Sequence, residues 1–91
     1  MATERIRIIV EGRVQGVFFR ASALDKARQF NLKGWARNLS DSNVEIVAEG
    51  EKKGLEQMKE WASHGPSGAR VTGIKAHYEP ATHEFESFTI R

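Results

Sequence analysis

Apolar residues recur with two different periods along the chain. Ile6, Ile8 and Val10 occupy every second position of segment 5–13, which is typical of a strand with one buried face. Apolar residues three and four positions apart predict amphipathic helices instead. This spacing occurs at 21–30 and 52–63, whereas the other strand-like segments are 34–39, 43–50, 69–79 and 85–91.

Turn-forming residues separate these segments. The run Ser-Asp-Ser-Asn at 40–43 predicts a hairpin between the two strands beside it. Asn31 ends the first helix in a conformation that Asn tolerates, and Gly65 followed by Pro66 ends the second. The alternation within 69–79 slips near Gly73, which predicts a β-bulge.

The order β-α-β-β-α-β, with a short extra strand near the end, predicts an α+β fold. It is typical of a ferredoxin-like split βαβ sandwich, in which an antiparallel sheet carries two helices on one face. A length of 91 residues predicts a single domain, 1–91. The expected core places Ile6, Ile8 and Val10, or their neighbours on the same strand, against Leu24, Ala27, Leu55 and Met58.

Composition and charge argue against several classes of protein. The net charge is only +2, and the basic residues are scattered from Arg5 to Arg91, so no nucleic-acid-binding face is expected. The absence of cysteine excludes a disulfide framework. No apolar run approaches the roughly 20 residues of a membrane span, and the first residues do not resemble a secretory signal. We therefore expect a cytoplasmic protein.

Most familiar catalytic arrangements are missing. There is no cysteine nucleophile, and neither common glycine-rich nucleotide loop occurs. His64, His77 and His83 lack metal-ligand spacing, so we expect structural or solvent-facing roles and no metal site. Glu45 and Glu49 share one face of a strand, where a solvated sheet edge is the expected setting.

The segment 12–20 (Gly-Arg-Val-Gln-Gly-Val-Phe-Phe-Arg) joins the first strand to the first helix. Backbone N–H groups in such a loop, with a helix dipole behind them, form an anion site. Gly16 permits the turn, and the guanidinium of Arg20 suits a phosphate. The alternatives are a tight turn followed by a surface arginine and, for Asn38, either a turn-forming residue or an amide that holds a water.

Segment 12–20 resembles the first signature of the acylphosphatases. Residues 34–38 (Gly-Trp-Ala-Arg-Asn), with Val44, Glu45 and Gly50, resemble the second. A weaker third segment begins at Gly65 and ends at Val71. The resemblance extends from about residue 5 to 91 and implies a ferredoxin-like hydrolase without cofactor that cleaves acyl phosphates to carboxylate and inorganic phosphate. It implies a phosphate-binding Arg20, a water-positioning Asn38 and a backbone cradle of Gln15, Gly16, Val17, Phe18 and Phe19.

That chemistry suits a site without acids or bases. The leaving group is a carboxylate, whose conjugate acid has a pKa near about 4, so it departs without a proton. Phosphoryl transfer has a loose transition state that positioning and electrostatics stabilise. An ordinary phosphomonoester has a far worse leaving group, an alkoxide, and its hydrolysis would need more catalytic groups than this sequence offers.

One departure from the second signature concerns the turn. Ser42 stands where the family usually has glycine, and a serine at positive φ would be strained, so we expect Asn43 to take the left-handed position. The acyl group is not identified, and an open site predicts broad specificity.

Two rival functions remain. One is a phosphate-binding regulatory domain without activity, of the kind found inside larger maturation enzymes, although the short chain favours a free-standing monomeric enzyme. The other is an RNA-binding domain of the same topology, which is disfavoured because 43–50 contains two acids and no aromatic residue.

Overall fold

The computed structural model describes residues 2–91, and it contains every element that the sequence predicts. The elements are β1 (Glu4–Arg13), α1 (Phe19–Gln29), β2 (Lys33–Asn38), β3 (Val44–Gly50), α2 (Lys52–Ala62), β4 (Arg70–Glu79) and β5 (Phe88–Ile90). Only the last strand is notably shorter than expected, with three residues in place of 85–91.

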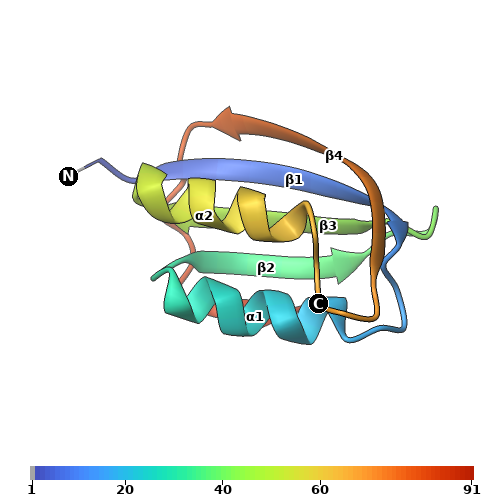
Figure 1. Ribbon diagram of the computed structural model, residues 1–91. Helices are drawn as coiled ribbons and strands as arrows, with labels where there is room; N and C mark the ends of the chain where they lie inside the picture. The colour runs from blue at the N-terminus through green and yellow to red at the C-terminus, as the bar shows by residue number, and fades with distance from the viewer. Residues whose placement is uncertain (1) are drawn as a thin grey trace.

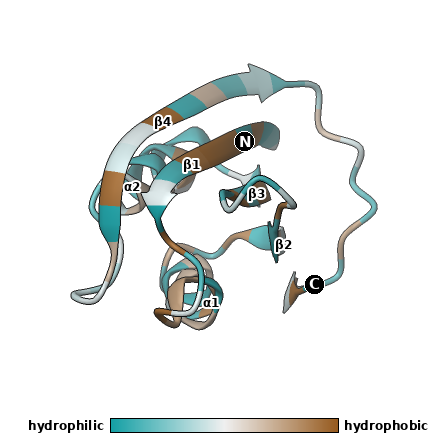
Figure 2. Ribbon diagram, turned by 90° about the vertical axis from the view of Figure 1, so that its right-hand side faces the viewer, coloured by the Kyte–Doolittle hydropathy of each residue, from teal (hydrophilic) through white to brown (hydrophobic). Residues whose placement is uncertain are grey.

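The strands form one sheet in the order β4-β1-β3-β2-β5, and both helices cover the same face (Figure 1). The pairs β4–β1, β1–β3 and β3–β2 are antiparallel, whereas β5 pairs with β2 in parallel. The prediction of an antiparallel sheet is therefore wrong at this edge. The segment 80–87 crosses the face opposite the helices, so β5 returns in the direction of β2 (Figure 2).

The core lies between the helices and the sheet. The side chains of Ile6, Ile8 and Val10 are fully buried, as predicted. Their helical partners Ala27, Leu55 and Met58 are also fully buried, and Leu24 packs at the margin of the core. The amphipathic periods of the sequence therefore identified the correct faces.

The predicted bulge lies in β4 at the end of β1. Glu11 pairs with Gly73 and Gly12 with Val71, which leaves Thr72 as the extra residue. Gly12 adopts a φ of 125°, and a Cβ at this position would overlap the carbonyl oxygen of Arg70. Only glycine therefore permits this close approach, just before the chain leaves β1 for the next loop.

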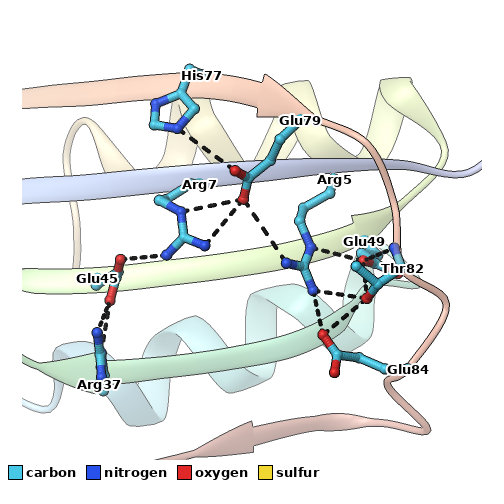
Figure 3. A network of polar contacts seen from close by, with 9 residues as sticks. All are labelled: Arg5, Arg7, Arg37, Glu45, Glu49, His77, Glu79, Thr82 and Glu84. Atoms are coloured by element: carbon cyan, nitrogen blue, oxygen red, sulfur yellow. Dashed lines mark hydrogen bonds and ion pairs between the residues drawn. The ribbon is translucent and has the colours of Figure 1, made fainter.

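The open face of the sheet is occupied by ion pairs rather than solvent (Figure 3). Glu45 is only 5% exposed and contacts Arg7 at 2.6 Å and Arg37 at 2.7 Å. Glu49 is only 4% exposed and contacts Arg5 at 2.8 Å. The expectation of a solvated edge is wrong because β3 is the middle strand, with basic residues on the strands beside it.

Glu49 also fastens the segment between β4 and β5 to the sheet. Its carboxylate accepts hydrogen bonds from the backbone N–H groups of Thr82 at 2.9 Å and His83 at 3.1 Å. Burial alone would raise the pKa of Glu49, but these N–H groups and the guanidinium of Arg5 outweigh it and hold the pKa below its ordinary value.

The β2–β3 turn differs from the expectation in one residue. Ser42 has a φ of 78°, so it occupies the left-handed position that we assigned to Asn43. Asn43 is already engaged, because its N–H donates to Asp41 and its carbonyl accepts from Leu39. Asn31, with a φ of 57°, ends the first helix as predicted.

Candidate active site

The C-terminal ends of β1 and β2 lie at the same end of the sheet, on either side of β3. Both strands are antiparallel to β3, which lies between them, so they point in the same direction. Val10 and Asn38 both pair with Val44, one from each side. The loop that follows β1 therefore emerges on the same side of the sheet as Asn38.

The loop 14–18 is anchored at both ends and exposed in the middle. Val14 and Phe19 are almost fully buried, and the Phe19 ring packs on Trp61 with centroids 5.1 Å apart. Gly16 and Phe18 have φ values of 74° and 61°, whereas Val17 between them has a negative φ. Alternating φ signs of this kind turn successive N–H groups toward one side, and the resulting concavity suits an anion.

The first turn of α1 adds further N–H donors. It contains no acidic residue, and no side chain caps the helix. Within residues 2–91, the backbone N–H groups from Gly16 to Arg20 donate to no acceptor. These N–H donors and the positive end of the helix dipole would both favour an anion at this position.

Arg20 and Asn38 line one cavity of about 300 Å³, although they come from different elements. The guanidinium of Arg20 donates a 2.7 Å hydrogen bond to the main-chain oxygen of Arg91. The exposed side-chain amide of Asn38 has no hydrogen-bond partner within residues 2–91. The remaining lining residues are Val14, Gly16, Phe18, Phe19, Ala21 and Ile90.

Two residues expected in the cradle lie outside this lining, namely Gln15 and Val17. Gln15 turns its side chain away to donate to the carbonyl oxygens of Leu39 and Asn43, at 2.8 Å each. Val17 packs against the core. Ile90 was not expected in the lining, because no local pattern along the chain indicates that the last strand lies beside β2.

Other hollows on the surface of the described residues lack the combination of Arg20 and Asn38. Three larger hollows, of about 590, 530 and 510 Å³, border α2, and neither Arg20 nor Asn38 is among their lining residues. Among the described residues, no cluster of three His, Asp or Glu side chains could hold a metal ion. His64 and His77 are largely exposed, as expected, beside Glu60 and Glu79. None of the helices described is long and apolar enough to cross a membrane.

Comparisons with known proteins agree on one family. The acylphosphatase profile matches residues 6–90. The acylphosphatase of Marinobacter nauticus is 49% identical over 88 residues, which cover 97% of this chain and 96% of that protein. The acylphosphatase structure from Bacillus subtilis shares 36% identity and a TM-score of 0.92, covering 97% of this chain and 98% of that one. The Coxiella burnetii acylphosphatase structure has the same TM-score with 37% identity, covering 98% and 93%.

Proposed function

This chain belongs to the acylphosphatase family. From that premise we propose that the protein hydrolyses the carboxyl–phosphate anhydride bond of acyl phosphates, and that the 300 Å³ cavity is its active site. One observation carries the proposal. Arg20 and Asn38 border the same cavity as Gly16, Phe18 and Phe19, whose backbone N–H groups have no acceptor within residues 2–91. In the part of the chain that the structure describes, no carboxylate or imidazole lines the cavity, and this reaction needs none, because the carboxylate leaves without a proton.

The phosphate group binds to the loop and the helix end. The N–H groups from Gly16 to Phe19 donate to the phosphate oxygens. The guanidinium of Arg20 forms a bidentate contact with the phosphate and neutralises its charge. Gln15 and Val17 contribute through the shape of the loop. The hydrogen bond from Arg20 to Arg91 orients the guanidinium before substrate arrives.

Asn38 holds the attacking water, accepting a hydrogen bond with its carbonyl oxygen or donating one from its amide N–H. The water oxygen attacks phosphorus in line with the scissile bond. That P–O bond breaks, its electron pair stays on the acyl oxygen, and a carboxylate leaves. The bound water loses a proton to solvent, so the products are carboxylate, inorganic phosphate and a proton. Charge on the transferring phosphoryl group is stabilised by Arg20 and the N–H groups.

The two rival functions find less support. An RNA-binding domain would stack bases on the open face of its sheet. Here that face carries ion pairs around Glu45 and Glu49, and the segment 80–87 crosses it. A regulatory domain that binds phosphate without turnover has the same cradle, so activity itself must separate the two.

Further properties stay predictions. All seven elements belong to one sheet and the helices on it, which supports a single domain over 1–91. A monomer and a cytoplasmic location remain our expectations from the sequence, and gel filtration tests the first of them.

The test is hydrolysis of benzoyl phosphate by purified protein in the presence of a chelator. We expect turnover in the parent and its collapse in both Arg20→Ala and Asn38→Ala. A folded parent that binds phosphate without turnover would support the regulatory rival instead.

A further inference from the structure

We infer that Phe18 and Ile90 form an apolar lip that binds the acyl group, so that the preferred substrates carry an aromatic or alkyl acyl chain. This inference rests on the proposed function and narrows its substrate class. It replaces the expectation of broad specificity with a preference that two side chains determine.

The first support is where exposed hydrophobic side chains lie. Among residues 2–91 only three large hydrophobic side chains are exposed, namely Phe18 (83%), Ile90 (43%) and Tyr78 (39%). Single exposed hydrophobic residues need no explanation, but clustering at one site does. Two of these three line the cavity that contains Arg20 and Asn38.

The second support is the backbone of Phe18. It adopts φ 61° and ψ 26°, a left-handed conformation that is unfavourable for a bulky side chain. Gly or Asn would fit this position with less strain. Because Phe18 is 83% exposed as a residue, burial does not compensate for the strain. The fold therefore gives no reason for a phenyl group here, whereas a ligand in the cavity does.

The third support is the chemistry of the cavity wall. Beyond Arg20 and Asn38, which the phosphate and the water occupy, the lining contains only Gly, Ala, Val, Ile and Phe residues. A charged or hydroxylated acyl group finds no polar side chain there. An apolar acyl group removes the Phe18 ring and the Ile90 side chain from water, and such burial favours binding.

The experiment compares benzoyl, hexanoyl, acetyl and succinyl phosphate as substrates. The test variants are Phe18→Asn, which keeps a residue suited to the left-handed backbone, and Ile90→Thr, which keeps a β-branched residue in the strand. We expect the ratio of kcat/KM for benzoyl over acetyl phosphate to fall about tenfold in Phe18→Asn, and less in Ile90→Thr. A tenfold change corresponds to about 1.4 kcal/mol. Comparing this ratio between parent and variant cancels the different intrinsic reactivities of the two substrates.

Two controls isolate the lip. Phe18→Tyr retains the ring, so the parent ratio should return. Tyr78→Thr removes the third exposed hydrophobic side chain, which lies outside the cavity, and should leave the ratio unchanged. Unchanged ratios in both Phe18→Asn and Ile90→Thr would overturn the inference, as would a parent that prefers succinyl phosphate.

Binding of unreactive analogues separates this inference from the proposed function. Benzoylphosphonate and acetylphosphonate are titrated against parent and Phe18→Asn, and amide resonances report affinity. A parent without turnover that still prefers the benzoyl analogue through Phe18 would refute the hydrolase and keep the lip. A parent that hydrolyses acetyl phosphate but binds both analogues equally would refute the lip and keep the hydrolase.

Discussion

The side-chain nitrogen of Gln15 lies 2.8 Å from the main-chain oxygen of Leu39, the residue that follows Asn38. The same nitrogen donates to the carbonyl oxygen of Asn43, also at 2.8 Å. Leu39 and Asn43 close the β2–β3 turn by their own hydrogen bond. Gln15 therefore ties the loop 14–18 to the turn beside Asn38, and fixes the two halves of the site relative to one another.

Gln15→Met should lower kcat about 10- to 100-fold, because it removes both donors and lets the Asn38 turn shift relative to the loop. Inhibition by inorganic phosphate should change much less, since the backbone N–H groups remain. Steady-state kinetics with benzoyl phosphate measures both quantities, and Gln29→Met, on the exposed face of α1, is the matched control. Equal losses in turnover and in phosphate inhibition would show that Gln15 acts on the cradle alone.

Asn38→Ala should reduce kcat by on the order of 10²–10³, the effect of one positioned group in a catalytic site. Phosphate binding should persist, because Asn38 contacts the water. Asn31→Gly, which suits the left-handed backbone at the end of α1, serves as the control. Turnover at the parent rate in Asn38→Ala would remove this residue from the mechanism.

Arg20→Ala should abolish binding of inorganic phosphate at millimolar concentration, because no other cationic side chain of the described residues lines the cavity. Arg20→Lys should bind more weakly than the parent, since an ammonium lacks the planar fork. Titration followed by amide resonances of Gly16 to Phe19 measures this, with Arg28→Ala as the control on the same helix. Parent-like shifts in Arg20→Ala would assign the phosphate to another group.

Ser42→Gly should stabilise the fold by about 0.5–1 kcal/mol. A left-handed serine costs roughly 1–2 kcal/mol, and glycine loses about half of that gain through the greater freedom of the unfolded chain. Urea unfolding measures the change. A less stable Ser42→Gly protein would mean that the serine side chain supports the turn in a way that the backbone conformation does not reveal.

Glu49→Gln should lower the free energy of unfolding by about 2 kcal/mol near neutral pH, the contribution of hydrogen bonds to a charged group. The pKa of Glu49 is depressed in the folded state, so its stabilisation is present above the unfolded pKa of about 4.3. It is lost as pH falls through the lower folded pKa. Urea unfolding between pH 7 and 3 should therefore show the two proteins converging in acid, and a constant difference would contradict this account.

The sequence predicted the elements well because local periods carry that information. Ile6, Ile8 and Val10 revealed their buried face through a period of two, and residues 12–20 carried a recognisable signature. The parallel pairing of β5, the burial of Glu45 and the place of Ile90 in the cavity were not predictable in this way. Each depends on which strands become neighbours, and such contacts join residues far apart along the chain.

The Ser42 error has a different cause. Both Ser42 and Asn43 suit a turn, and intrinsic preference favours Asn at positive φ. The pairing of Asn38 with Val44 and the hydrogen bonds of Asn43 decide the matter, because they leave only Ser42 free to reverse the chain. The register of the β2–β3 pairing therefore decides which residue takes positive φ here, against the intrinsic conformational preference of the two residues.

The cavity is complete only while the short strand β5 is paired with the sheet, so it depends on the local opening equilibrium of this strand. The strand has three residues and lies at the edge of the sheet, yet it supplies Ile90 and leads to the Arg91 oxygen that orients Arg20. Short edge elements open at a lower free energy than the whole domain. While β5 is detached, the four antiparallel strands persist and the cavity lacks a wall. We therefore expect a fraction of the folded molecules to be inactive at any moment, and the activity to fall on warming before cooperative unfolding begins.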